Sequence, residues 1–350
     1  MKLRSPFRTC LLGLLISIAP LTPTLAQSTA AQKEAMFLYQ GADRDAKLVQ
    51  EAKKEGSLTW YTSFSPSDSA PLAQAFEKKY GVKVEVWRAV SEKIVQRIVT
   101  EGRANRHVFD VVETNGPELE VMAREKLLAR FWSPHFADMP AFAIAPNGMW
   151  VADHMAIFVV AYNTKLIKRE DLPKTFEGFI DPKWKGKLGV EANDGEWMAA
   201  MVRAMGQERG MAFMRNLSDM KPDVRTGHIL LAEMVSSGEV PVALTAYHVN
   251  ATALKAKGGP IDYVALDPVV LRAQSMGISR NAPHPHAALL FTDFMLNEGQ
   301  AMMESMTRAP VSKKINSEFN RYKYVMITPE IAIDEADKWR NLWDTMFVKK

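Results

Sequence analysis

Predicted strands and helices alternate in the first third of this chain, and this alternation constrains the fold more than any other feature. The side-chain pattern at 57–61 predicts a strand. Ser65 then fits a helix N-cap, with Pro66 at the first helical position, Asp68 as capping-box partner and Gly81 at the end. The pattern continues with a strand at 82–87, a helix at 91–101 closed by Gly102, a strand at 108–112 and a helix from about Glu118. This β-α-β-α-β order is typical of a doubly wound α/β sheet.

Length and charge further restrict the kind of protein that this chain can be. The chain has 350 residues, of which 47% are hydrophobic and 24% charged, so it can bury a large core and has the length of two domains. The formal net charge is +4, without a basic block or interleaved basic and aromatic residues. We therefore expect no nucleic-acid partner.

The N-terminus has the features of an export signal. Three basic side chains within 2–8 precede an apolar run at 10–21, and small residues follow at 24–26. The apolar run is too short to span a bilayer, which takes about 20 residues. We predict a signal peptide over 1–26 and a periplasmic location. Cys10, the only cysteine, lies in this segment, so we expect neither disulfides nor thiolate metal sites in the remainder.

Three later segments carry further information. Two apolar, β-rich runs, at 150–163 and 271–276, look like crossovers between two lobes. The segment 276–300 reads as a short apolar strand, a turn made rigid by Pro285, and a helix over about 286–303 with a continuous apolar face.

This last segment, written MGISRNAPHPHAALLFTDFM, resembles a conserved-looking stretch of the periplasmic solute-binding proteins that serve ABC importers. The branch it resembles most handles iron(III), thiamine and phosphonates. The turn DPKWKGKLGV at 181–190 and the block AEMVSSGEV at 232–240 resemble two other stretches of this family. The resemblance extends from about 58 to about 305. It implies a binding protein rather than an enzyme, with a membrane permease and an ATPase as partners.

The resemblance also implies a type II periplasmic binding protein fold, in which doubly wound mixed sheets form two lobes joined by a two-strand hinge. The expected N-terminal lobe comprises 27–157 and 272–312, and the C-terminal lobe comprises 158–271 and 313–350. The helix at 286–303 should then pack on the N-terminal lobe although it comes late in the chain. We expect a monomer without a cofactor.

Ligands of open α/β sheets bind beyond the carboxyl ends of the strands, where loops lead into helix N-termini. The loops in these positions are rich in hydroxyl and amide groups. The predicted ligand-binding residues are Thr62, Ser63, Ser65, Asn115, Thr226, His228, Tyr247 and His248. Their chemistry fits a small, oxygen-rich anion such as a phosphonate, a phosphate ester or a carboxylate. Structural roles compete with this interpretation, because Ser65 suits a helix cap, Asn115 a turn and His228 a solvent-facing position.

This chain has matching residues for only part of the family's ferric site. Ferric-binding members have a Tyr-Tyr pair where this chain has Tyr247 and His248. The family's first-loop histidine falls near Ser65, and its acidic ligand falls near Asn115. Fe³⁺ favours phenolate and carboxylate oxygens, which this set supplies poorly, so no metal site is predicted on this basis.

Three alternatives remain open. The first is a ferric-ion receptor that uses Tyr247, His248 and an external anion. The second is a secreted hydrolase, which the absence of a Gly-x-Ser-x-Gly motif, a His-Glu-x-x-His motif and a cysteine nucleophile disfavours. The third is a sensor subunit with the same two lobes.

Overall fold

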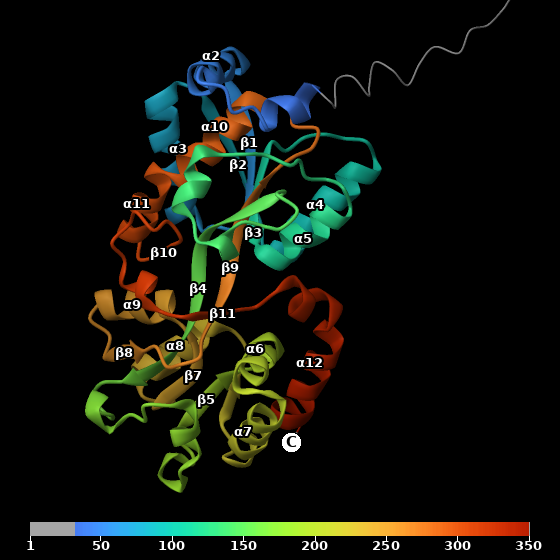
Figure 1. The fold of residues 1–350 in the computed structure, drawn as a ribbon. Coiled ribbons are helices and arrows are strands. Elements are labelled where there is room, and N and C mark those ends of the chain that lie inside the picture. Colours follow the sequence, from blue (N-terminus) through green and yellow to red (C-terminus); the bar gives the residue numbers. More distant parts are fainter. Residues whose placement is uncertain (1–31, 350) are drawn as a thin grey trace, which may run out of the picture.

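The computed structural model describes residues 32–349. The predicted signal peptide, 1–26, therefore lies outside the described residues. Within them, no helix combines the length and the apolar character that a membrane crossing requires. The chain forms two α/β lobes, one above the other in Figure 1, with the two longest strands running from one lobe into the other.

The N-terminal lobe has the predicted β-α-β-α-β order. Its elements are α2 (Arg44–Glu55), β1 (Ser57–Thr62), α3 (Pro66–Tyr80), β2 (Lys83–Arg88), α4 (Ser91–Arg103), β3 (Val111–Asn115) and α5 (Gly116–Arg124). Strands β2 and β3 flank β1 in parallel. Helix α4 does not end at Gly102 as predicted. A Cβ at Gly102 would lie 2.5 Å from Leu127 Cδ2, so this glycine permits close packing rather than ending the helix.

The C-terminal lobe repeats the design. Its elements are β5 (Leu188–Glu191), α6 (Gly195–Met205), α7 (Gln207–Asp219), β6 (Asp223–Arg225), α8 (His228–Ser237), β7 (Val242–Tyr247), α9 (His248–Ala256), β8 (Ile261–Val264) and α12 (Ala336–Trp343). Strand β5 is parallel to both β6 and β7. Helix α12 packs on α6, with Trp197 and Trp343 buried against each other.

Strands β4 (Trp150–Asn163) and β9 (Val269–Ile278) connect the lobes, at the two predicted crossovers. Strand β4 pairs antiparallel with β9 as far as Ile157 and with β7 from Phe158 onward. The strand order is β2-β1-β3-β9-β4-β7-β5-β6. This is the predicted fold class, although the exact division of the chain between the lobes stays a prediction.

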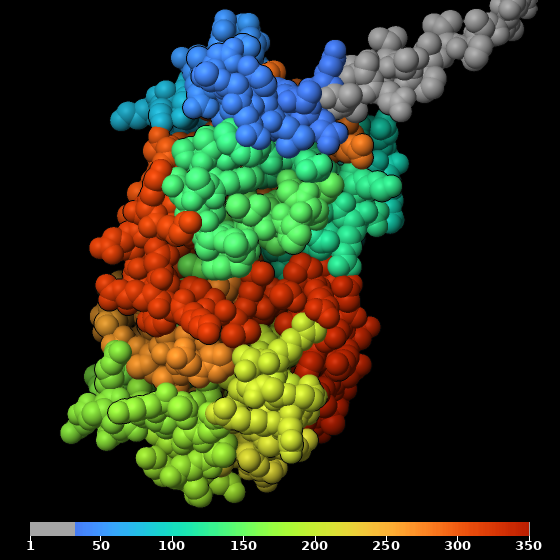
Figure 2. All heavy atoms as spheres, in the orientation of Figure 1, coloured from blue at the N-terminus to red at the C-terminus, as the bar shows by residue number. Residues whose placement is uncertain are grey.

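A third connection crosses the same junction. Strand β10 (Ala309–Pro310) pairs with the N-terminal part of β4, and β11 (Tyr324–Met326) pairs with the C-terminal-lobe end of β9. Figure 2 shows the late chain, in red, as a band between the two lobes on this face.

The predicted helix over 286–303 is two helices, α10 (Pro285–Leu296) and α11 (Glu298–Ser305). Asn297 interrupts them with a non-helical backbone (φ −117°, ψ −96°). Every residue of α10 from Ala287 to Leu296 is buried, and α10 packs on α2, α3 and β1 of the N-terminal lobe. A buried ion pair of 2.7 Å between Arg44 and Asp293 fastens α10 to α2.

Strand β4 contains a bulge that shapes the junction. Its register to β9 shifts between Ala152 and His154, which leaves Asp153 as the extra residue. Gln300, fully buried on α11, donates to the carbonyl oxygen of Asp153 at 2.8 Å. Its own amide oxygen accepts from the backbone N–H groups of Val311 and Ser312 at 2.9 and 3.0 Å. One side chain thus satisfies the backbone groups that the bulge and β10 leave unpaired.

Buried glutamates hold the loops at the strand ends. Glu113, in the middle of β3, accepts from the Thr62 hydroxyl at 2.5 Å and from the backbone N–H groups of Ser63 and Phe64 at 3.1 and 3.3 Å. Glu191, at the end of β5, accepts from the N–H groups of Asn193 and Gly227 at 2.5 and 2.9 Å. In each lobe a carboxylate on one strand fixes the loop of its parallel neighbour.

Replacing Gln300 should destabilise the protein strongly. Gln300→Leu keeps an apolar stem but leaves buried backbone donors and acceptors without partners, each at about 1–3 kcal/mol. We expect the free energy of unfolding to fall by about 3 kcal/mol or more, measured by urea denaturation. Gln96→Leu, on the exposed face of α4, is the control and should change it little. Equal effects of the two variants would contradict the assigned role of Gln300.

Glu113 should make stability depend on pH. Burial, with a smaller contribution from Asp153, raises its pKa from 4.5 to about 7. The folded state therefore binds more protons than the unfolded state between these values, and stability falls as pH rises from about 4.5 through 7. The contribution of this group is about 3 kcal/mol across the window. Glu113→Gln should flatten the profile in chelator-treated protein, whereas Glu233→Gln, at an exposed position, should not.

Candidate functional site

A cavity of about 400 Å³ lies where the loops of both lobes meet β4. The N-terminal lobe contributes the loop after β1 and Glu113 of β3, and the C-terminal lobe contributes the starts of α8 and α9. The lining residues are Ser63, Phe64, Ser65, Glu113, His154, Met155, Ala156, Gly227, His228, Ile229, Tyr247, Val249, Asn250, Gln274 and Arg308. The cavity therefore occupies the position expected for a ligand at the carboxyl ends of parallel strands.

Four of the eight predicted site residues line this cavity. Ser63 and Ser65 lie on the N-terminal-lobe side, and His228 and Tyr247 lie on the C-terminal-lobe side. Ser65 precedes α3 as expected, but its hydroxyl does not cap the helix. It donates instead to Asp68 Oδ2 at 2.7 Å.

The other four do not line it. Thr62 is buried, and its hydroxyl donates a hydrogen bond to Glu113. Asn115 lies behind the wall, where its amide donates to Ser91 and Glu118 and its oxygen accepts from Gln274. Thr226 is exposed, one residue before the lining begins at Gly227.

His248 is the clearest departure from the predicted site. It opens α9 with its ring turned into the core, where it is 1% exposed and meets the Phe319 ring. Its Nδ1 accepts from the backbone N–H of Ile157 at 3.4 Å. Burial lowers its pKa to about 3, so the imidazole is neutral. Adjacent residues at a strand-to-helix junction point to different sides, and only Tyr247 faces the cavity.

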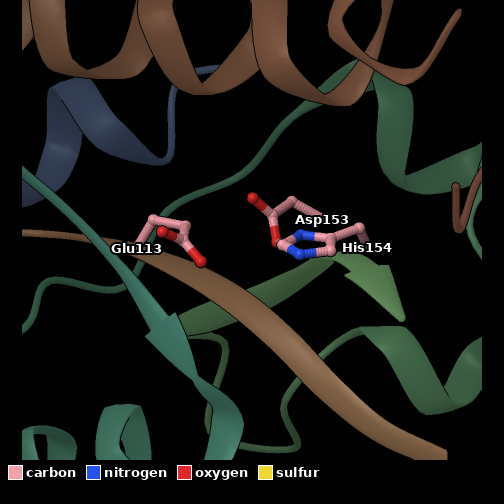
Figure 3. Close-up of side chains that lie close together, drawn as sticks. All are labelled: Glu113, Asp153 and His154. Carbon is pink, nitrogen blue, oxygen red and sulfur yellow. The ribbon is translucent and has the colours of Figure 1, made fainter. Parts of the chain in front are cut away.

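Glu113, Asp153 and His154 form a cluster that the sequence interpretation did not single out (Figure 3). One ligand atom from each lies within 4.8 Å of the others. The bulge in β4 brings the consecutive side chains of Asp153 and His154 together, with His154 Nδ1 3.1 Å from Asp153 Oδ1. In the sequence, the polar pair Asp153-His154 inside the apolar run 150–163 is the feature that could have indicated this cluster.

Burial disfavours charge on all three groups of this cluster. It raises the pKa of Asp153 far above its usual range and lowers the pKa of His154 to about 3. Asp153 therefore holds a proton that it can donate to His154 Nδ1. The Phe64 ring stacks on His154 with centroids 4.7 Å apart and shields this side of the cavity from water.

Tyr247 dominates the opposite wall. Its ring lies 4.0 Å from that of His228 and 4.7 Å from that of Phe158, measured between centroids. Burial raises its pKa, although the nearby Arg272 guanidinium opposes the shift. Tyr247 is thus a neutral phenol.

Two arginines accompany the acidic groups. Arg308 lines the cavity and bonds to Asp68 at 2.5 Å, while its Nε is buried without a hydrogen-bond partner among the described residues. Arg272, on β9, pairs with Glu196 at 2.6 Å. The cavity therefore offers carboxylate, phenol and imidazole donors together with one cation that can meet an anion.

Comparisons with known proteins agree with this architecture. Residues 71–323 match the family described as bacterial extracellular solute-binding protein. The iron uptake protein A1 of Synechocystis is 22% identical over 320 residues, which cover 81% of this chain and 85% of that protein.

Two solved structures share the fold. Iron-bound HitA from Pseudomonas aeruginosa aligns with a TM-score of 0.69 at 24% identity, over 82% of this chain and 99% of that one. AfuA from Actinobacillus pleuropneumoniae, with exogenous fructose-6-phosphate bound, aligns with a TM-score of 0.67 at 21% identity. The alignment covers 83% of this chain and 98% of that one. The AfuA structure is titled as that of a periplasmic binding protein. The relatives as a group are substrate-binding transport proteins rather than enzymes. With its fold and family match, this chain belongs to the bacterial extracellular solute-binding proteins, the binding components of ABC importers.

Proposed function

We propose that the protein captures ferric iron in the cavity between its lobes and delivers it, in the periplasm, to a membrane permease with its ATPase. One observation carries the proposal. A buried carboxyl group, Glu113, and a phenol, Tyr247, line a single cavity from opposite lobes. These are the oxygen donors that a hard trivalent cation prefers.

A cation in the cavity would displace protons from its ligands. Glu113 carries a proton below its pKa of about 7, and Tyr247 carries one because burial raises its pKa. Loss of these protons would give two anionic oxygens to Fe³⁺. A cation would also draw the shared proton to His154 Nδ1, leaving His154 Nε2 as a ligand and Asp153 as the carboxylate that orients it.

The relatives support iron over the organic anion that the sequence favoured. The Synechocystis relative is named for iron uptake, and the Pseudomonas structure is titled as iron-bound. The ligand set proposed here differs from the one considered on sequence alone. His248 has no access to the cavity, and Glu113 replaces the position near Asn115.

A second candidate is an oxygen-rich organic anion bound without metal. Arg308 favours it, because its Nε is buried and unpartnered while the residue lines the cavity beside Ser63 and Ser65. The AfuA structure holds a sugar phosphate. Under the ferric proposal these same groups bind an anion that completes the coordination of Fe³⁺.

Iron loading should colour the protein. Fe³⁺ bound to the Tyr247 phenolate gives a visible tyrosinate charge-transfer band, which ferric nitrilotriacetate should produce at one iron per chain. Tyr247→Phe should abolish the band and weaken iron binding at least tenfold, or about 1.4 kcal/mol. Tyr263→Phe is the matched control, since Tyr263 also has a raised pKa but bonds to Glu318 outside this cavity. A colourless protein after loading would contradict the ferric proposal.

The two cargo candidates separate in a calorimetric comparison. Under the ferric proposal, citrate or phosphate should tighten iron binding, and Arg308→Met should remove that enhancement because the anion loses its charged partner. Without iron, citrate, phosphate and fructose-6-phosphate should bind no tighter than millimolar. Micromolar binding of any of them to metal-free protein, lost in Arg308→Met, would establish the organic-anion candidate instead.

A further inference from the structure

A second group of metal-ligating side chains lies in the C-terminal lobe. Glu191 ends β5, Asp194 precedes α6, and His228 opens α8. One ligand atom from each lies within 4.8 Å of the other two. The carboxylates are 3% and 2% exposed, and the His228 side chain is 17% exposed where it reaches the cavity. The ferric site proposed above does not use these three ligand groups.

Hydrogen bonding fixes the orientation of the His228 ring. Nδ1 lies 3.0 Å from the carbonyl oxygen of Thr245. A carbonyl only accepts, so Nδ1 carries the proton and donates it. In the neutral imidazole, Nε2 then presents a lone pair toward Asp194 Oδ1, 3.4 Å away. Metal-binding histidines are typically held in this way, with the second nitrogen donating to a carbonyl or carboxylate.

Asp194 supplies an independent observation. Its Oδ2 is buried and has no hydrogen-bond partner among the described residues, and its side chain does not cap α6. An unpartnered carboxylate oxygen away from water is costly. A protonated His228 compensates only Oδ1, since the recorded contact is to that atom.

Glu191 retains capacity for a cation. Its Oε1 accepts from Gly227 N and from the Asn193 side chain, and its Oε2 accepts from Asn193 N. Each carboxylate oxygen has two lone-pair directions, so the loop contacts leave Oε2 one direction free.

We propose that Glu191, Asp194 and His228 form a second cation site, which takes a divalent transition metal of the Zn²⁺ or Mn²⁺ class. One imidazole nitrogen and two carboxylate oxygens form a ligand set that such ions accept, with water or cargo in the remaining positions. The site goes beyond the proposed ferric function and does not depend on it, because its ligands come from the C-terminal lobe alone.

The test is calorimetric titration of the chelator-treated, signal-free protein with Zn²⁺. We expect one ion per chain, bound at least tenfold more weakly in Asp194→Asn and in His228→Gln. His107→Gln and Asp171→Asn, both at exposed positions, are the matched controls and should leave Zn²⁺ binding unchanged. Absence of Zn²⁺ binding, or binding that Asp194→Asn and His228→Gln leave unaltered, would overturn the proposal.

Two further measurements show why a variant loses Zn²⁺ binding. Circular dichroism and thermal unfolding without metal check that each variant folds. His228→Gln is the variant less expected to disturb the core, because His228 is partly exposed. Zn²⁺ binding should persist in Tyr247→Phe and Glu113→Gln. If Zn²⁺ binding persists in these variants and iron loading gives no tyrosinate band, the ferric function is contradicted and the second cation site is supported. Loss of Zn²⁺ binding in Tyr247→Phe would instead assign Zn²⁺ to the ferric site and overturn this inference.

Discussion

The antiparallel pairing of β4 with β9 supports both lobes and the site between them. Strand β4 pairs with β9 over its first half and with β7 and β8 over its second, so one continuous backbone belongs to both sheets. All but one of its fourteen residues are buried, which leaves little tolerance for a shift in register. The bulge at Asp153 occurs on this strand and places Asp153 and His154 side by side. The cavity wall is thus a consequence of how the central strands pair.

In both lobes a buried glutamate satisfies the backbone N–H groups of a loop at a strand end. A ligand loop at the end of a strand has backbone N–H groups that need acceptors, and water is excluded there. Glu113 and Glu191 supply these acceptors from the neighbouring parallel strand. Glu113 both organises a loop and lines the cavity. This dual role places an acidic group in a site whose loops contain mostly hydroxyl and amide side chains.

The sequence predicts the alternation of β1 to α5, the crossovers and the late helix of the N-terminal lobe, because these depend on periodicity and on Pro and Gly positions. It does not predict the break at Asn297, which lies within an otherwise helical pattern. Ser63, Ser65, His228 and Tyr247 line the cavity because strand ends can be located from the pattern.

The remaining site residues depend on information that the pattern lacks. Tyr247 and His248 are adjacent, and only the local backbone decides which ring faces the cavity. Glu113 and Asn115 are two residues apart in β3, so their side chains share a face, and the register of β3 against β1 decides which of them reaches the loop after β1. Arg308 reaches the cavity from a segment about 150 residues beyond β4.

The third connection, from β10 to β11, has a mechanical consequence. A ribbon of two strands bends easily but also twists about its long axis, so two lobes joined only by β4 and β9 would sample many relative orientations. A further covalent link across the same junction removes much of the torsional freedom and leaves bending as the principal soft coordinate. Any opening and closing of the lobes should then follow a nearly one-dimensional path. Fewer orientations are lost when a solute holds the lobes together, and the entropic cost of capture is correspondingly smaller.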